Sequence, residues 1–366
     1  MEALLLRITH LPVARFTALL GLTLAATAWA AAPTYRVTDL GVPQEATSTQ
    51  PAALNDAGEV LGQASVFDQK VGIQPFLWSA ATGTRWWDTV LTSGRNALGA
   101  LNNRGRVVGT HQAQDGSGTF TSQAFVWTET NGVRLLGGLV PGSNSFGNAI
   151  NDRAQVVGSA TAADGAPHLF VWSSSQGMVD RNPAGALGSY GYAINLSGQV
   201  AGTMVLTDGR QRAILVEPKG HSTRLGCIGA DNGQTCDSEA FGINDRGEVV
   251  GVSGTGARSH GFIWSAEAGM RDIAVDGPYA GNEVKAQAIN ASGQVVGSLM
   301  VQNFYRAAYW DAANGLHDIA DLIDPADSLA GRVKYTLPVG INAAGQIALS
   351  GEIDGVKHAM VLTPLH

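Results

Sequence analysis

A stretch built around a glycine turn recurs seven times along the chain, and this repetition constrains the fold more than any other feature. One copy, GINDRGEVVG, runs from Gly242 to Gly251. The asparagine of each copy serves as its anchor, and successive anchors lie 44 to 52 residues apart: Asn55, Asn102, Asn151, Asn195, Asn244, Asn290 and Asn342. A period of this length with strand-like content is typical of propeller blades. We therefore expect an all-β fold, a seven-bladed β-propeller with four antiparallel strands per blade.

Each copy has the pattern of a short strand, a tight turn and a second strand. Asn favours the first position of a type I turn and Gly the fourth, where it also accepts the positive φ of a bulged hairpin. The third copy has Ala154 in place of this Gly, so we expect local strain there. Two residues before each anchor stands only Ala or Gly, which predicts that this strand is the innermost one, where backbones converge around an axis.

A third strand follows each turn and carries large aromatic residues. It reads Phe76-Leu77-Trp78, Phe125-Val126-Trp127, Phe170-Val171-Trp172 and Phe262-Ile263-Trp264, with Ala308-Tyr309-Trp310 as a near match. The Phe and Trp are two residues apart and share one sheet face, so we predict that both pack between blades. Val216 and Leu362 replace the Trp in the fourth and seventh copies, where we expect poorer packing.

The two ends of the repeat region complement each other. Only residues 363–366 follow Leu362, so the last blade lacks a fourth strand. The missing strand is found near the other end, in TYRVTDLG, Thr34 to Gly41. We expect this segment to pair beside His358–Leu362, which closes the ring and removes a free sheet edge. Residues 34–366 are then one propeller domain.

Histidines that begin the third strand suggest a known family. They occur in HLFVW, His168 to Trp172, and HGFIW, His260 to Trp264, with looser forms at His358–Leu362 and Gln123–Trp127. Together with the IN-xx-G-xVVG turn, these motifs resemble the bacterial HAF repeat family over most of residues 50–366. The resemblance implies export and a propeller-like repeat fold, and it supplies no catalytic residues. Histidines in separate blades cannot share one metal at ~2 Å ligand distances, so we expect structural hydrogen bonds.

The first thirty residues have the pattern of a secretory signal peptide. Arg7 and Arg15 precede the apolar run Phe16–Ala32, and Ala28–Ala30 form a small-x-small cleavage pattern. A membrane anchor is the alternative, but the run is short for one. We therefore expect a protein exported to the periplasm or the cell exterior. The whole chain has a net charge of −7, and such an acidic surface argues against nucleic acid and anionic membranes as partners.

Cys227 and Cys236 stand close together in CIGADNGQTC. In an exported protein such a pair is expected to form a disulfide, and two unpaired buried thiols are the alternative. The spacing excludes a CxxC redox or zinc motif.

The expected propeller has one face of short, repetitive turns and an opposite face of long, varied loops. Varied loops on a rigid scaffold are where binding is usually built. Three long loops, at 227–239, 276–285 and 321–336, and the inner-strand starts supply the candidate binding residues: Tyr190, Tyr192, Asp231, Asp237, Glu239, Tyr279, Glu283, Lys285, Asp321 and Asp324. Gln287 joins the same channel mouth.

The acidic residues raise the question of calcium. Two sets of carboxylates have the right chemistry, namely Asp231, Asp237 and Glu239, and Asp321, Asp324 and Asp327, although solvated surface carboxylates are the default interpretation. The turn residues Asp56, Asp152 and Asp245 are expected to make local turn bonds. No metal or other cofactor is assigned.

No GxSxG, HExxH, Walker or CxxC pattern is present, so the sequence assigns no catalytic residue. We expect an exported, non-catalytic binding or scaffold protein, monomeric, that recognises a protein or glycan through its long-loop face. The alternative is a hydrolase or lyase at the channel mouth, with Glu239, Asp237 and Tyr190 as acid–base groups. A purely structural surface protein is a third interpretation.

Overall fold

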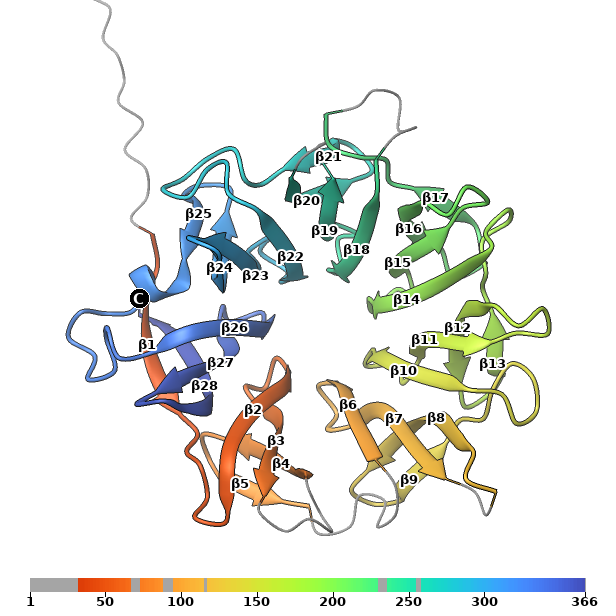
Figure 1. Ribbon diagram of the computed structural model, residues 1–366, viewed down its shortest axis with the longest axis horizontal. Helices are drawn as coiled ribbons and strands as arrows, with labels where there is room; N and C mark the ends of the chain where they lie inside the picture. Colours follow the sequence, from red (N-terminus) through yellow and green to blue (C-terminus); the bar gives the residue numbers. More distant parts are fainter. Residues whose placement is uncertain are drawn as a thin grey trace, which may run out of the picture.

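Seven four-stranded antiparallel sheets stand around a central opening in the computed structural model (Figure 1), which confirms the predicted seven-bladed propeller. The structure describes residues 32–66, 73–87, 95–114, 117–229, 236–254 and 258–365. The predicted signal peptide, residues 1–30, lies outside this part of the chain. Within it, no helix is both long and apolar enough to cross a membrane.

The blades are numbered by their anchors, from blade 1 at Asn55 to blade 7 at Asn342, and each sheet runs outward from its innermost strand. Blades 1 to 3 contain β2 Ala46–Leu54, β3 Val60–Val66, β4 Ile73–Ser79, β5 Gly83–Trp86; β6 Arg95–Leu101, β7 Val107–Gln114, β8 Phe120–Thr128, β9 Gly132–Leu135; and β10 Ser145–Ile150, β11 Val156–Thr161, β12 Pro167–Ser173, β13 Gly177–Asp180. Blades 4 to 6 contain β14 Gly188–Ile194, β15 Val200–Val205, β16 Gln211–Val216, β17 Ser222–Arg224; β18 Ser238–Ile243, β19 Val249–Gly254, β20 Ser259–Ser265, β21 Gly269–Asp272; and β22 Val284–Ile289, β23 Val295–Val301, β24 Phe304–Asp311, β25 Gly315–Asp318. Blade 7 contains β26 Lys334–Ile341, β27 Ile347–Ile353, β28 Val356–Leu365 and β1 Thr34–Asp39, and the short 3-10 helix η1, Ile319–Leu322, precedes it.

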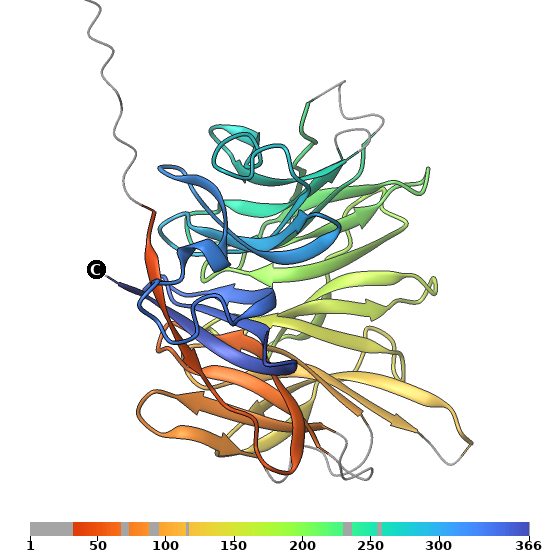
Figure 2. The same ribbon diagram turned by 60° about the vertical axis from the view of Figure 1, so that its left-hand side comes forward.

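The start of the described chain completes the last blade, as the sequence predicts. β1 pairs antiparallel with β28, from Thr34 opposite Leu365 to Asp39 opposite Met360. Figure 2, in which the left side of Figure 1 comes forward, shows β1 running along β28 at the outer edge of the ring. The ring is therefore closed by two segments from opposite ends of the sequence.

The core lies between neighbouring blades. Leu61 and Leu77 of blade 1, for example, pack with Leu101 and Phe125 of blade 2. The Gly that ends each VVG motif allows this packing, because a Cβ at Gly251 would collide with the backbone oxygen of Glu239 on the inner strand and with the ring of Phe262. The motif therefore has Gly at the position where the Phe ring of the third strand lies against the second strand.

The aromatic pair of the third strand divides into a core residue and a boundary residue. Phe76, Phe125, Phe170 and Phe262 are at most 1% exposed, as predicted. The Trp residues lie nearer the end of the strand, and only Trp172 among them is buried. Val216 and Leu362, at 1% and 0% exposed, are more buried than the half-buried Trp residues they replace. The burial gives no sign of the poorer packing expected there.

Of two predictions about small residues, that of strain at Ala154 is confirmed and that of crowding at the inner strands holds in part. Ala154 has a φ of 60°, the left-handed conformation that the repeat needs and that strains a residue with a Cβ. A Cβ at Gly242 would come within about 3 Å of the backbone of the next inner strand, as crowding around the axis predicts, whereas a Cβ at Gly340 would meet nothing. Crowding therefore explains Gly242 but not Gly340.

The strand-three histidines make structural contacts within their own blades. The Nδ1 atoms of His168 and His260 lie 2.7 Å from Oδ2 of Asp180 and Asp272 on the fourth strand. In blade 7, His358 makes the same contact, at 2.8 Å, with Asp39 of β1. Asp39 comes from the other end of the chain, so in blade 7 the same His–Asp contact joins the two segments that close the ring.

Candidate functional site

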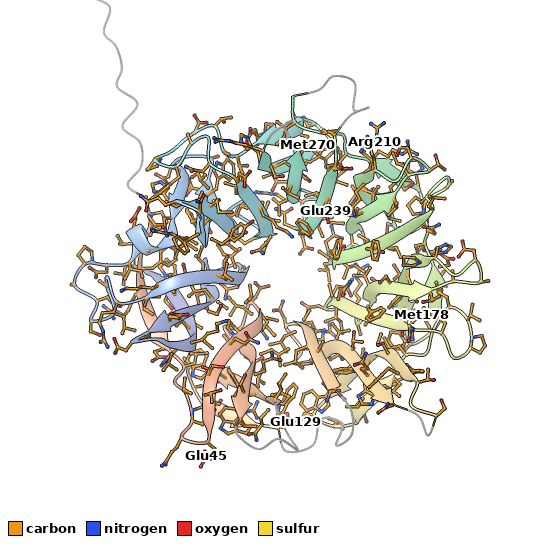
Figure 3. All side chains as sticks on the ribbon, viewed as in Figure 1. Glu45, Glu129, Met178, Arg210, Glu239 and Met270 are labelled. Atoms are coloured by element: carbon orange, nitrogen blue, oxygen red, sulfur yellow. A yellow bond between two sulfur atoms is a disulfide. The ribbon has the colours of Figure 1, made fainter. Side chains whose placement is uncertain are left out.

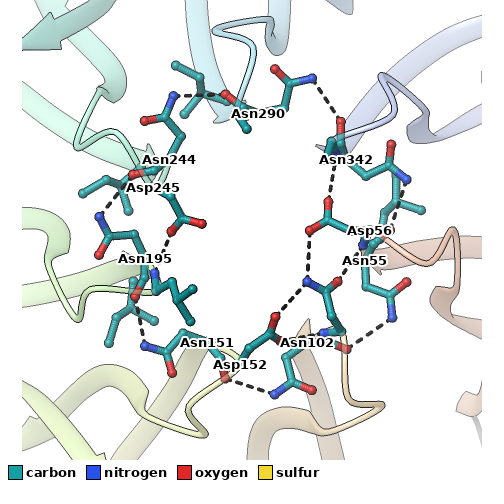
Figure 4. Close-up of a pocket in the computed structure, with 18 of the residues that line it drawn as sticks. Asn55, Asp56, Asn102, Asn151, Asp152, Asn195, Asn244, Asp245, Asn290 and Asn342 are labelled. Carbon is teal, nitrogen blue, oxygen red and sulfur yellow. Dashed lines mark hydrogen bonds between the residues drawn. The ribbon is translucent and has the colours of Figure 1, made fainter.

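The turn-face mouth of the channel is built from the seven anchor asparagines (Figure 4). Each is 3% to 6% exposed, and each side-chain Nδ2 donates to the backbone oxygen of the anchor in the next blade at 2.9 to 3.2 Å. The series runs from Asn55 to Asn342 and returns to Asn55. Every blade is therefore tied to its neighbour by the same buried bond.

The rest of each anchor side chain holds its own turn. In every blade Oδ1 accepts from the backbone N–H four residues on, as in Gln155 to Asn151 at 3.0 Å. Asn195 and Asn290, which begin glycosylation triplets, are engaged in the same way. Because their amides are buried and bonded, the repeat explains both triplets.

The turn aspartates bind across blades, which corrects the expected local turn bonds. Oδ1 of Asp245 accepts from the backbone N–H of Leu196 in blade 4 at 2.7 Å, and Oδ1 of Asp56 accepts from that of Ala343 in blade 7 at 2.8 Å. Asp152 likewise binds Asn103. The anchor Oδ1 already satisfies the local donors, so the next side chain reaches the neighbouring turn. The cavity they surround has a volume of about 310 Å³.

The long-loop end of the channel has different chemistry. Tyr190 and Tyr192 of β14 stack with ring centroids 6.4 Å apart, and the Tyr192 ring lies 5.5 Å from that of Phe241 on β18. Nζ of Lys285, on β22, lies 4.1 Å from the Phe241 ring centroid, a cation–π distance. These residues, which we call the aromatic sector, form a continuous wall on the inner strands of blades 4, 5 and 6.

Glu239 adds a carboxylate to the aromatic sector. It precedes Phe241 by two residues on β18, and Figure 3 places it at the inner edge of the ring. Burial, followed by the charge of Glu239 and the neighbouring Tyr190, raises the pKa of Tyr192 to about 12. The Tyr192 phenol is therefore neutral at physiological pH and can donate a hydrogen bond. In blade 6, Oε1 of Gln287 is a buried acceptor that has no hydrogen bond within the described residues.

The structure brings Tyr190, Tyr192, Glu239 and Lys285 together at this channel mouth. Phe241 was missed by the sequence reasoning. It could have been found because it stands three residues before its anchor, the position that Tyr192 occupies in blade 4.

The long loop before blade 7 packs against β1, and a binding role for Asp324 stays a prediction. The backbone N–H of Asp324 donates to the oxygen of Tyr35, and its side chain accepts from Ala326. Asp327 accepts from the backbone N–H of Val37 at 2.9 Å. The carboxylate of Asp327 thus holds the loop to β1, whereas that of Asp324 caps a turn within the loop.

The loop at 276–285 is joined to the loop before blade 7 by one short bond. The hydroxyl of Tyr279 donates to Oδ2 of Asp321 at 2.5 Å. Burial and this bond raise the pKa of Tyr279. Glu283, half-buried, precedes β22 and uses its backbone oxygen to accept from Met300. The pair Tyr279 and Asp321 thus fixes one loop to another.

The predicted disulfide between Cys227 and Cys236 is present. Arg212 of β16 is 5% exposed and donates to the backbone oxygen of Cys236. Oδ1 of Asp237 accepts from the backbone N–H of Gln211 at 2.8 Å and lies 3.9 Å from the Arg212 guanidinium. The crosslinked loop is therefore held to blade 4 through Asp237, and Asp231 lies outside the described residues. Within the described ranges, no group of three His, Cys, Asp or Glu residues could hold a metal ion.

No model of a protein family matches the chain, and no curated protein does either, so membership of the HAF repeat family stays a prediction. Among solved structures, an oligogalacturonate lyase in complex with manganese matches with a TM-score of 0.54 at 15% identity, over 92% of this chain and 95% of that one. A mutant of puromycin hydrolase in complex with PGG matches with a TM-score of 0.52 at 17% identity, over 88% of this chain. The chain spans only about half, 52%, of that hydrolase. A lectin from Burkholderia pseudomallei has a TM-score of 0.47 at 13% identity, over 87% of this chain and 96% of that one. At these identities, the likenesses to the lyase and the hydrolase show a shared propeller fold.

Proposed function

We propose that this protein is an exported binding protein that recognises a glycan at the long-loop mouth of its central channel. The observation that carries the proposal is the aromatic sector. It presents three partly exposed rings from adjacent blades beside an ammonium group and a carboxylate.

The chemistry of the aromatic sector suits a sugar better than a flat protein surface. Aromatic rings supply a broad apolar area against which the apolar face of a pyranose packs, and the tyrosine hydroxyls remain available as polar groups. Lys285 and Glu239 then offer a donor and an acceptor to sugar hydroxyls. A concave site with a few convergent polar groups is typical of small-ligand recognition.

The interpretation as a binding protein is supported over that of a hydrolase or lyase. Asp237, one of the three suspected acid–base groups, accepts a backbone hydrogen bond and pairs with Arg212. A raised pKa keeps Tyr192 in its neutral form, which suits hydrogen bonding to a ligand. The disulfide in the loop before β18 supports export, since such bonds persist in oxidising compartments.

The test is a glycan array with the purified protein, followed by calorimetry on the best glycan. Phe241→Ala and Tyr192→Ala should each weaken binding at least tenfold, since each removes a stacking surface. Tyr305→Ala is the matched control because this tyrosine is 57% exposed on β24, outside the aromatic sector. Failure to bind any glycan, or equal loss in all three variants, would overturn the proposal.

A further inference from the structure

A second concave site lies between blades 1 and 2 on the face opposite the long loops. The cavity has a volume of about 860 Å³, within the range of small-ligand pockets. Its residues come from β4, β5 and the first turn of blade 1, and from β8 and two turns of blade 2. Those that matter are Trp86, Trp87, Trp127, Arg85, Arg104 and Arg106. We call this cavity the tryptophan groove.

The tryptophans of the groove depart from the repeat. Trp86 on β5 is the strand partner of Phe76 on β4. In blade 5 the partner of the equivalent residue, Phe262, is Asp272. Trp87 follows Trp86 at the place of Ile273, which is 1% exposed. Trp87 is only half-buried, and its ring stacks on Trp127 of blade 2 at a centroid distance of 4.1 Å. Blade 1 thus places an indole at the groove where blades 2, 4 and 5 have the aliphatic residues Leu136, Leu225 and Ile273.

The charges of the groove favour an anion. Among the residues that the structure describes, the guanidinium groups of Arg104 and Arg106 have no carboxylate partner. Arg85 lies 3.7 Å from Glu129, which is 81% exposed and near the junction of the two blades in Figure 3. Exposed pairs of this kind contribute little and exchange readily. The remaining carboxylate, Glu59, accepts from Asn55. The lining thus has three guanidinium groups and two carboxylates, a small net positive charge on a chain of net charge −7.

We propose that the tryptophan groove binds an acidic oligosaccharide, with sugar rings packed on the indoles and uronate carboxylates paired with Arg104 and Arg106. Guanidinium groups match carboxylates in a bidentate geometry, and the indole faces provide the apolar surface that a free anion cannot use. The combination should exclude two kinds of ligand. A neutral sugar lacks the charge, and a polyanion without rings lacks the stacking surface.

The proposal is tested by calorimetry and tryptophan fluorescence with trigalacturonate, its methyl ester as the neutral match, and polyphosphate as the ringless polyanion. Trigalacturonate should bind and quench fluorescence, with affinity falling as salt rises. The methyl ester and polyphosphate should bind at least tenfold more weakly. Equal binding of either one, or no binding of trigalacturonate at millimolar concentration, would overturn the inference.

Variants locate the site. Arg104→Gln and Trp87→Leu should each weaken trigalacturonate binding at least tenfold. Leu fills the equivalent position in blade 4, at Leu225, and Arg104 is exposed, so both variants should keep the fold. Arg153→Gln changes the same turn position in blade 3 and is the matched control. An equal loss in Arg153→Gln would show non-specific charge attraction and refute the site.

The tryptophan groove does not depend on the channel site. Phe241→Ala should leave trigalacturonate binding unchanged, and Arg104→Gln should leave any array glycan bound at the channel unaffected. Each proposal can therefore fail while the other holds.

Discussion

Replacing one anchor asparagine with alanine tests whether the buried ring of side chains holds the blades together. Asn244 is a suitable choice because its amide makes four bonds, as do those of several other anchors. Nδ2 donates to the oxygen of Asn290 at 3.0 Å and to Oε2 of Glu248 at 2.7 Å. Oδ1 accepts from the backbone N–H groups of Arg246 at 3.1 Å and Glu248 at 3.0 Å. One bond joins blades 5 and 6, and the other three hold the turn.

The expected cost follows from these four bonds. A typical intramolecular hydrogen bond contributes ~1 kcal/mol net, and a buried donor left without a partner costs ~1–3 kcal/mol. Asn244→Ala loses all four bonds and leaves the backbone N–H of Glu248 without its acceptor. Because water can reach part of the turn, we expect a loss of about 3 kcal/mol in the free energy of unfolding.

The measurement is urea denaturation followed by circular dichroism, with Asp245→Ala as the matched control. Asp245 is the adjacent residue and is exposed, and it makes one inter-blade bond, to Leu196. Its loss should cost at most about 1 kcal/mol. A cost at Asn244 no greater than at Asp245 would refute the reasoning.

Three further predictions follow from single features. Ala154→Gly should raise the free energy of unfolding by up to about 1 kcal/mol in urea denaturation, because a φ of 60° strains alanine; a loss of stability would contradict this. Replacing both Cys227 and Cys236 with Ser should cost ~2.7 kcal/mol on the chain-entropy estimate for a ten-residue loop, and no change in the urea midpoint would contradict it. The raised pKa of Tyr192, about 12, means that stability is fully present below pH ~10 and falls as pH rises towards 12; Tyr192→Phe should flatten this fall in an alkaline urea series.

The sequence alone was sufficient to predict the architecture, because the residues that a blade requires recur in seven copies. The match between Thr34–Gly41 and the last blade could be recognised because the repeat shows which strand that blade lacks. The turn glycines and the small inner-strand residues depend on local backbone geometry. Burial of the third-strand Phe follows from strand alternation for the same reason. These requirements are short in range, so a linear reading recovers them.

The contacts between blades could not be predicted in the same way. The anchor asparagine was correctly placed in its turn, but its Nδ2 bond to the next blade joins residues about 48 positions apart. The loop carrying Asp324 and Asp327 was predicted to supply binding residues, and its packing on β1, nearly 290 residues away in sequence, was not anticipated. Such contacts depend on how blades are rotated relative to each other, which no local pattern specifies.

The places where the repeat is broken are the places where both proposed sites lie. The position three residues before the anchor holds Ala52 and Gly99 in blades 1 and 2, but Tyr192 and Phe241 in blades 4 and 5. The end of the fourth strand holds Asp or Leu in most blades, but Trp86 in blade 1. Residues required by the scaffold recur because every blade meets the same neighbours. A large aromatic residue confined to one or two blades is not required by that geometry, and this is why both proposals start from such residues. The scaffold can hold two such sites because each depends on different blades and their shared interfaces.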